Sequence, residues 1–266
     1  GLAACTVMLK SHQTLPGERI ILAGNGPLLI LVAYYVVKFG GKIEAIIDTS
    51  KKSHWLKSIF SLVLSPQNFI QGITWMLKII FSRIPIYSNS MVTKVTNEKN
   101  GISVEIKNIE NKKLKKINAE VLAVGHGLTP STDITRLLRV DHVYNELKGG
   151  WIAKIDKYFR SSAKGLYITG DGAGISGAVA AHDKGKLTAY AILFDENIID
   201  EKEFKQETIQ ILRKLNRYEI FAKGIANLNS SPKELINNID ENTILCRCED
   251  ITKKEIIHAI KKGAKN

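Results

Sequence analysis

The stretch GLYITGDGAG, residues Gly165–Gly174, decides the fold class. An apolar, strand-like run over Leu166–Thr169 ends at Gly170-Asp171, and a helical pattern begins near Gly177. An acidic side chain at the carboxyl end of a buried strand is where an α/β sheet holds ribose or ribityl hydroxyl groups. The glycines let the backbone approach a ligand, and the helix N-terminus favours a negative partner. The stretch therefore predicts a cofactor site, the simpler alternative being a strand, a surface turn and a helix.

A second glycine turn lies near the start of the chain. Arg19–Ala23 has the pattern of a strand, Gly24-Asn25-Gly26 of a turn, Leu28–Phe39 of a helix and Ile43–Ile47 of another strand. This βαβ order, with glycines that let a pyrophosphate approach the helix N-terminus, predicts a nucleotide site. The fold class we expect is therefore α/β, with Rossmann-like domains.

Asp48 ends the second strand and lies 22 residues after Gly26. This is close to the spacing at which nucleotide-binding folds place the acidic residue that hydrogen-bonds the adenosine ribose. Leu29 occupies the place of the usual third glycine, which weakens the motif. Asp48 favours NAD over NADP because a carboxylate repels a 2′-phosphate. Lys51 and Lys52, close by, leave that preference open.

The remaining elements follow from periodicity and turn residues. Predicted helices cover 1–13, 51–81 with a break at 66–68, 135–138 and 201–228, and predicted strands cover 86–87, 91–96, 102–107, 113–117, 121–124 and 149–155. The strands between 91 and 117 form a three-stranded meander in this interpretation. The strand Val121–Val124 is expected to be buried, and Gly125 after it lets the chain cross close over a cofactor. His126 follows in a loop, where a structural or solvated histidine is the more usual case and a catalytic role is the alternative. His182 is expected on the outer face of its helix, with no role.

Composition and charge narrow the class of protein. The 266 residues are enough for two domains, and the net charge is +12. The excess is mostly Lys spread along the chain, so we expect solvated faces and no nucleic acid, an acidic partner protein being the alternative. Three cysteines exclude a disulfide scaffold, and without a secretory signal we expect a cytoplasmic protein. Residue 1 is Gly within a helical pattern, so we expect a fragment of a longer chain.

Residues 58–77 carry no formal charge. Such a run invites a membrane-spanning helix, but Pro66-Gln67-Asn68 interrupts it. Two short apolar helices, packed on the domain or docked to a partner or a membrane surface, fit this pattern better.

Cys246-Arg247-Cys248 is the one cysteine pair with metal-ligand spacing. Thiolates one residue apart suit an iron–sulfur cluster or zinc, although two ligands make only half of a four-ligand site. Cys5 lies far away in sequence and makes a poor third ligand. Two free cysteines are the alternative.

Four segments together resemble a known family of FAD/NAD(P)-type flavoprotein subunits. They are LPGERIILAGNGPLL (15–29), VLAVGHGLTPSTD (121–133), GLYITGDGAGISGA (165–178) and TILCRCEDIT (243–252). The family includes the alpha subunits of bacterial opine oxidases, hydrogen cyanide synthase, and the proline and hydroxyproline dehydrogenases. The segments follow one another in the family's order.

The resemblance implies two Rossmann-like domains, one inserted in the other, with a β-meander and a ferredoxin-like [2Fe–2S] module. The implied boundaries are a leading helix at 1–16, an NAD(P)-type domain at 17–117 and the second half of the FAD domain at 118–199. A helical linker would cover 200–241, and the start of a truncated [2Fe–2S] module would cover 242–266.

The resemblance also implies roles for single residues. Asp171 would bind the ribityl chain of FAD, Gly125, Gly170 and Gly172 would pass close to FAD, and Gly177 and Ala178 would face the flavin pyrimidine edge. Gly24, Gly26 and Asp48 would hold NAD(P) or a structural adenine nucleotide. Cys246 and Cys248 would supply half of the cluster ligands. No catalytic acid or base is implied.

Three functions stay open at this point. We expect an electron-transfer subunit that passes electrons through FAD and [2Fe–2S] from an amine or amino acid oxidised by a partner flavoprotein subunit in a hetero-oligomer. The first alternative is a self-contained NAD(P)H-dependent reductase of ferredoxin type. The second is a non-catalytic partner-binding scaffold.

Overall fold

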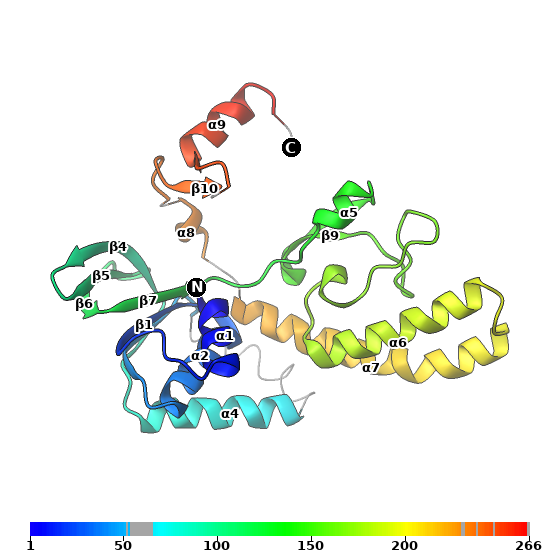
Figure 1. Ribbon diagram of the computed structural model, residues 1–266, viewed down its shortest axis with the longest axis horizontal. Coiled ribbons are helices and arrows are strands. Elements are labelled where there is room, and N and C mark those ends of the chain that lie inside the picture. The colour runs from blue at the N-terminus through cyan, green and yellow to red at the C-terminus, as the bar shows by residue number, and fades with distance from the viewer. Residues whose placement is uncertain (52, 54–65, 230–231, 238, 247, 265–266) are drawn as a thin grey trace. The chain divides into compact units, whose positions relative to one another are not determined.

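The chain forms two compact units, Gly1–Ser230 and Ser231–Asn266. The structure, a computed structural model, describes residues 1–51, 53, 66–229, 232–237, 239–246 and 248–264. Figure 1 shows the helices and strands with the labels used below.

A parallel sheet organises the first part of unit 1. Its strand order is β3-β2-β1-β7, formed by β1 (Arg19–Gly24), β2 (Lys42–Asp48), β3 (Ile86–Ser88) and β7 (Val121–Gly125). Side chains alternate between the two faces of a strand. Accordingly, Ile20 and Leu22 enter one core, and Ile21 and Ala23 enter another. The sheet is therefore covered on both faces, as apolar parallel strands require.

Helices cover one face of this sheet. They are α1 (Leu2–Ser11), α2 (Gly26–Lys38) and α4 (Pro66–Phe81). Leu9, Val32 and Ile79, one from each helix, are completely buried in the shared core. Burying one such side chain contributes about 1.5–3 kcal/mol, so this layer fixes the strands whose ends carry the first glycine turn.

The β-meander covers the opposite face of the sheet. Its strands β4 (Ser90–Glu98), β5 (Gly101–Asn108) and β6 (Leu114–Ala119) pair antiparallel in sequence order. Val104 and Ile106 of β5 pack with Ile21 and Ile47 of the parallel sheet. The predicted three-stranded meander is confirmed.

A separate core holds the second glycine turn. The elements in this part are α5 (Asp133–Leu137), β8 (His142–Asn145), the 3-10 turn η1 (Glu146–Lys148), β9 (Gly150–Ala153), the 3-10 turn η2 (Gly170–Ala173), α6 (Ala178–Asp195) and α7 (Glu201–Asn229). Helices α6 and α7 lie side by side (Figure 1). Leu187 of α6 and Ile211 of α7 share the core with Val140 and Phe159.

Three predictions about strands were wrong. Leu166–Thr169 is no regular strand, because its backbone joins Arg160 only through an isolated bridge at Tyr167. A strand needs a neighbouring strand for its hydrogen bonds, and here Ser161 N–H and Ile168 N–H form single bonds to Leu166 O and Phe159 O instead. Asp171 therefore does not follow a buried strand.

The other two corrections concern β7 and β9. In the described sheet β7 is an edge strand, so Ala123 is buried but Val124 is 37% exposed. The strand predicted over 149–155 is limited to β9, which pairs with β8. No strand was predicted at β8, because its four residues are too few to show an alternating pattern.

Helix α4 covers part of the uncharged segment. The helix begins at Pro66, so Pro66-Gln67-Asn68, where we expect a break, forms its start, and residues 54–65 lie outside the described part of the chain. Among the helices that the structure describes, none has the length and apolar character needed to cross a bilayer.

Unit 2 contains α8 (Lys233–Asn237), β10 (Ile244–Cys246), β11 (Ile251–Thr252) and α9 (Lys253–Lys261). Strands β10 and β11 pair antiparallel. A capping box begins α9: the Thr252 side chain accepts from the Glu255 N–H, and the Glu255 carboxylate accepts from the Thr252 N–H.

Candidate functional site

Gly24, Asp48 and Gly125 lie in one row at the carboxyl ends of three adjacent parallel strands. Gly24 of β1 is the register partner of Asp48 in β2 and of Gly125 in β7. The carboxyl edge of a parallel sheet is where α/β proteins bind ligands. The structure thus brings together three predicted site residues that come from distant parts of the sequence.

The backbone of Gly24 leaves no space for a side chain. Its φ is +150°, and a Cβ atom at Gly24 would lie 1.8 Å from the Gly125 carbonyl oxygen. Close contact between β1 and β7 therefore requires glycine at this position. Gly125 is needed for packing as well, since its own Cβ would lie 2.9 Å from the Leu2 side chain.

Gly26 begins α2 with a φ of +74°, and Pro27 follows at the first helical positions. The first turn of α2 contains no acidic residue. The partial positive charge of the helix N-terminus is therefore not countered from within that turn, and it faces the strand ends that carry Gly24. A phosphate group suits this position.

Asp48 is buried, with 6% of its surface exposed. Its Oδ1 accepts hydrogen bonds from the backbone N–H of Ser50, at 2.8 Å, and from Ser50 Oγ, at 2.7 Å. These bonds shape the loop after β2, while Thr49 N–H donates to the Gly24 carbonyl at 2.9 Å. Asp48 thus fixes the loop next to the glycine turn.

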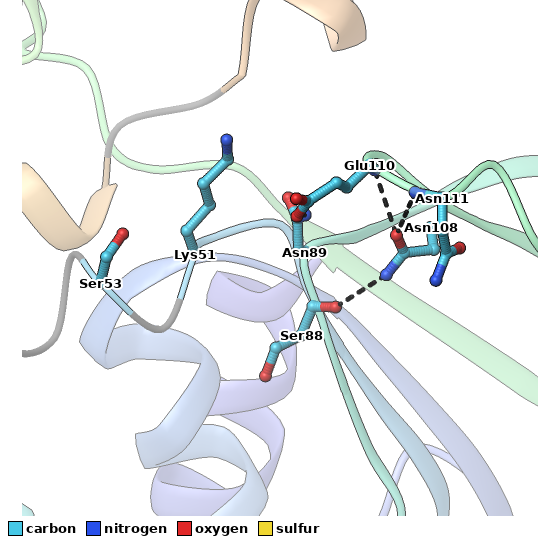
Figure 2. Close-up of a pocket in the computed structure, with 7 residues that line it drawn as sticks. All are labelled: Lys51, Ser53, Ser88, Asn89, Asn108, Glu110 and Asn111. Atoms are coloured by element: carbon cyan, nitrogen blue, oxygen red, sulfur yellow. Dashed lines mark hydrogen bonds between the residues drawn. The ribbon is translucent and has the colours of Figure 1, made fainter.

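A cleft of about 580 Å³ opens beside this loop (Figure 2). Ser88, at its base, is the register partner of Asp48. The cleft is lined by Lys51, Ser53, Ser88, Asn89, Asn108, Glu110 and Asn111. Its wall on one side comes from the meander, which the sequence did not connect with the nucleotide turn.

Two asparagines hold the wall of the cleft. Asn108 Oδ1 accepts from the N–H groups of Glu110 and Asn111 (Figure 2). Asn89 Nδ2 donates to Glu110 Oε2 at 3.2 Å, and Asn89 N–H donates to the Ser50 carbonyl. Asn89 Oδ1 is buried and has no hydrogen-bond partner in the described structure. A buried acceptor of this kind fits a ligand that brings a donor.

The predicted residues of the second glycine turn lie at a different hydrophobic core from Gly24 and Asp48. Gly170 has a φ of +65° and opens η2, and Asp171 after it is exposed. The Asp171 carbonyl accepts from the Gly174 N–H at 2.9 Å, which closes the turn. A Cβ atom added at Gly172 would lie 3.5 Å from the Ile168 side chain, which is an ordinary van der Waals contact. The Asp171 carboxylate is accessible to a ligand.

Helix α6 begins directly after this turn. Gly177 is its N-cap with a φ of +91°, Ala178 is its first residue, and its first turn contains no acidic residue. A Cβ atom at Gly170 or Gly177 would meet no atom within 4 Å. Ser176 Oγ is buried without a hydrogen-bond partner among the described residues. An open helix N-terminus with a buried hydroxyl beside it fits a flavin edge.

Lys184 of α6 is a functional candidate that the sequence reasoning missed. It is 8% exposed, and its Nζ donates to the carbonyl groups of Gly170 and Gly174. The signal was present: Ala180, Lys184, Leu187 and Ala191 recur at helical spacing, which puts the lysine on the buried face of α6. His182, by contrast, is exposed, as expected.

Cys246 and Cys248 lie in unit 2. Cys246 ends β10 and is half-buried, whereas Cys248 is exposed, and both are free thiols. Within the described residues, no group of three His, Cys, Asp or Glu side chains could hold a metal ion. The pair supplies two of the four thiolates that a [2Fe–2S] cluster needs, so the residues fit half of such a site.

Known proteins with similar sequences are oxidoreductases or components of larger enzymes. Residues 62–185 match the family described as pyridine nucleotide-disulphide oxidoreductase. Hydrogen cyanide synthase subunit HcnB of Pseudomonas aeruginosa is 24% identical, covering 100% of this chain and 58% of that protein. One of the opine oxidase subunits of Rhizobium meliloti is 27% identical, covering 97% of this chain and 49% of that protein. The chain spans about half the length of the curated relatives that it matches.

A solved structure shares the fold. L-proline dehydrogenase from P. horikoshii gives a TM-score of 0.59 at 17% identity, covering 98% of this chain and 40% of that chain. The similarity confirms a mixed α/β fold related to a dehydrogenase structure. The match of residues 62–185 to an oxidoreductase family model and this shared fold agree with the predicted α/β class.

Proposed function

We propose that the protein is the electron-transfer flavoprotein subunit of an amine or amino-acid dehydrogenase or oxidase, of the opine, proline or hydroxyproline type. One observation carries the proposal. Two glycine turns on separate cores each lead into a helix whose first turn has no acidic residue. Two such turns in one chain suit two dinucleotide sites.

In this proposal the second glycine turn belongs to the FAD site. Asp171 holds ribityl hydroxyl groups, and the backbone of Gly170 and Gly172 lies against the cofactor. Gly177 and Ala178 present the N-terminus of α6 to the pyrimidine edge of the flavin, where the helix dipole stabilises negative charge. FAD, when bound, supplies the redox step. Gly125 passes close to the same cofactor.

The row at the sheet edge holds the second nucleotide in this proposal. Amide groups at Gly24 and Gly26 face its pyrophosphate, and Asp48 accepts from ribose hydroxyl groups. The cleft beside Asp48 offers 580 Å³ and a buried acceptor, Asn89 Oδ1. This nucleotide is NAD(P) or a structural adenine nucleotide.

Cys246 and Cys248 are proposed to ligate a [2Fe–2S] cluster, with the other two thiolates from elsewhere in the complete enzyme. The domains we propose are an NAD(P)-type domain that starts at 17 and extends past the expected end at 117 to include β7, which pairs with β1, then the second half of an FAD domain up to 199 and a [2Fe–2S] module starting at 242. A substrate-oxidising flavoprotein is the partner. The relatives named as subunits support a hetero-oligomer.

The experiment is anaerobic flavin spectroscopy on the full-length protein with and without its partner flavoprotein. We expect loss of the oxidised flavin absorbance on addition of an opine, proline or hydroxyproline only when the partner is present. Rapid loss of this absorbance on addition of NADH alone would instead favour the self-contained NAD(P)H-dependent reductase. The row formed by Gly24, Asp48 and Gly125, with the cleft beside it, also suits that alternative. A full-length protein that takes up no FAD would support the scaffold alternative.

A further inference from the structure

A lysine buried in α6 has no role in the function proposed so far. Lys184 is 8% exposed, between Ala180 and Leu187 on the side of α6 that enters the core. Burying an ammonium group is costly unless hydrogen bonds satisfy it. Its hydrogen-bond partners therefore explain why it is there.

The ammonium group joins the two ends of the second glycine turn. Lys184 Nζ donates to the Gly174 carbonyl oxygen at 2.7 Å and to the Gly170 carbonyl oxygen at 3.2 Å. Asp171 lies between these two glycines. A single side chain thus sets the separation of the backbone on either side of Asp171.

The opposite side of the turn is held by Lys148. A Cβ atom at Gly174 would lie 2.8 Å from Lys148 Cδ, and Gly174 has a φ of +104°. Lys148 Nζ pairs with Glu219 of α7 at 3.2 Å. The turn is therefore confined between the stem of Lys148 and the ammonium group of Lys184, and only glycine fits at position 174.

The charges around Lys184 are mixed. Burial lowers the pKa of Lys184, and Lys148 lowers it further, while Asp171 and Glu219 act in the opposite direction. Both protonation states of the amine keep N–H groups that can donate to the two carbonyls. The hydrogen bonds to the turn can therefore form in either protonation state, and they are stronger when the amine is charged.

We propose that Lys184 is a positioning residue of the FAD site, which fixes the Gly170–Gly174 turn so that Asp171 faces the ribityl chain. The inference rests on the proposed function, because it assigns Asp171 to FAD. Lys184 itself touches the turn and not the cofactor. Its removal would leave two carbonyl groups without their donor and let the turn change shape before FAD binds.

The test compares Lys184→Met with Lys184→Arg and with Lys186→Met in the full-length protein. Lys186 is exposed on the same helix, so Lys186→Met removes the same charge without touching the turn. FAD affinity is measured by titrating the apoprotein, and hydrogen exchange is followed in peptides covering 165–180 without FAD. We expect Lys184→Met to weaken FAD binding about tenfold, the equivalent of one to two lost hydrogen bonds. Exchange should accelerate in the turn alone, with Lys186→Met unchanged and Lys184→Arg intermediate.

Two results would overturn the inference. One is FAD affinity and turn exchange in Lys184→Met equal to those of the wild type. The other is faster exchange throughout α6 and α7, which would make Lys184 a general support of the core. If Lys184→Met does not fold, Lys184→Gln, which keeps one donor group, takes its place and should weaken FAD binding by a smaller factor. A wild-type protein that binds no FAD would instead refute the proposed function, and this inference with it.

Discussion

Gly24 and Asp48 are register partners at the carboxyl ends of β1 and β2, and the residue after Asp48 closes the contact. Thr49 donates its backbone N–H to the Gly24 carbonyl at 2.9 Å, and its Oγ1 lies 3.3 Å from the same oxygen. The glycine turn and the acid of the predicted nucleotide site are thus held by one loop. Substitutions at either residue test that site directly.

Gly24→Ala should lower the free energy of unfolding more than the same change at a glycine that has open space around it. The new Cβ would lie 1.8 Å from the Gly125 carbonyl oxygen, so β1 and β7 would have to separate. We expect a loss of about 3 kcal/mol in the free energy of unfolding. Gly40→Ala is the control, because φ is +79° there but no atom lies within 4 Å, and about 1 kcal/mol is expected. Urea unfolding followed by circular dichroism measures both, and equal losses would contradict the account.

Asp48→Ala should weaken nucleotide binding and loosen the loop after β2. The change removes the acceptor of Ser50 N–H and Ser50 Oγ, at a cost of about 1–3 kcal/mol in stability. We expect affinity for NAD to fall about tenfold, and any preference over NADP to shrink, because the carboxylate no longer repels a 2′-phosphate. Calorimetric titration with both nucleotides measures this. Ser50→Ala, which keeps the carboxylate, should retain the nucleotide preference.

Much of the nucleotide half was predictable from local patterns. The short apolar run of β1, the glycines at 24 and 26 and the acid at 48 are all short-range signals, and the structure forms a strand, a turn and a helix there. The cleft beside Asp48 was not predictable. Its wall comes from Asn89 and Glu110, whose positions depend on how the meander packs on the sheet.

The flavin half was harder to predict for two physical reasons. Leu166–Thr169 is apolar enough for a strand, but hydrogen bonds to a neighbouring strand decide whether one forms, and only an isolated bridge is present. Lys184 was overlooked because lysine is usually exposed, and its burial depends on two carbonyl groups ten and fourteen residues away.

Asp171→Ala should lower FAD retention without loss of the fold. Asp171 is exposed, and the hydrogen bond that closes the turn uses its backbone carbonyl, which alanine also provides. We expect the variant of the full-length protein to be purified with less than about half of the wild-type flavin content, because one hydrogen bond to a charged group is lost. The ratio of flavin absorbance to protein absorbance measures it. Glu196→Ala, at the exposed C-cap of α6, is the control, and unchanged flavin in Asp171→Ala would refute the assignment.

Acid should weaken the contact that anchors the segment before Gly170. Arg160 donates from Nε and from a terminal nitrogen to the Asp195 carboxylate, both at 2.6 Å, and Tyr167 Oη donates to it too. Hydrogen bonds from Arg160 first, and then from Tyr167, hold the pKa of Asp195 below its ordinary value of 3.8, against the opposite effect of burial. Since the folded-state pKa is depressed, the contribution to stability is present above the unfolded-state value and is lost as pH falls through the folded one.

The matched variant for this contact is Asp195→Asn. We expect the wild type to need more urea for unfolding than Asp195→Asn at about pH 6, and the difference to shrink below about pH 4. A series of urea titrations across this range measures it. A difference that stays constant down to the lowest pH would show that the carboxylate charge does not matter.

Cys246 and Cys248 should be required for a [2Fe–2S] cluster but not for the flavin. The pair lies in unit 2, whereas the turn at Asp171 belongs to unit 1. In the full-length protein, Cys246→Ser and Cys248→Ser should each abolish the electron paramagnetic resonance signal of the dithionite-reduced cluster, because hydroxyl groups are poor ligands for iron in such clusters. Flavin content should stay within about a fifth of the wild type, since the cysteine pair and the turn at Asp171 belong to different compact units. Cys5→Ser is the control for the loss of one thiol, because Cys5 is buried in the core of α1. A cluster signal that survives in both pair variants would mean that these thiolates are not ligands.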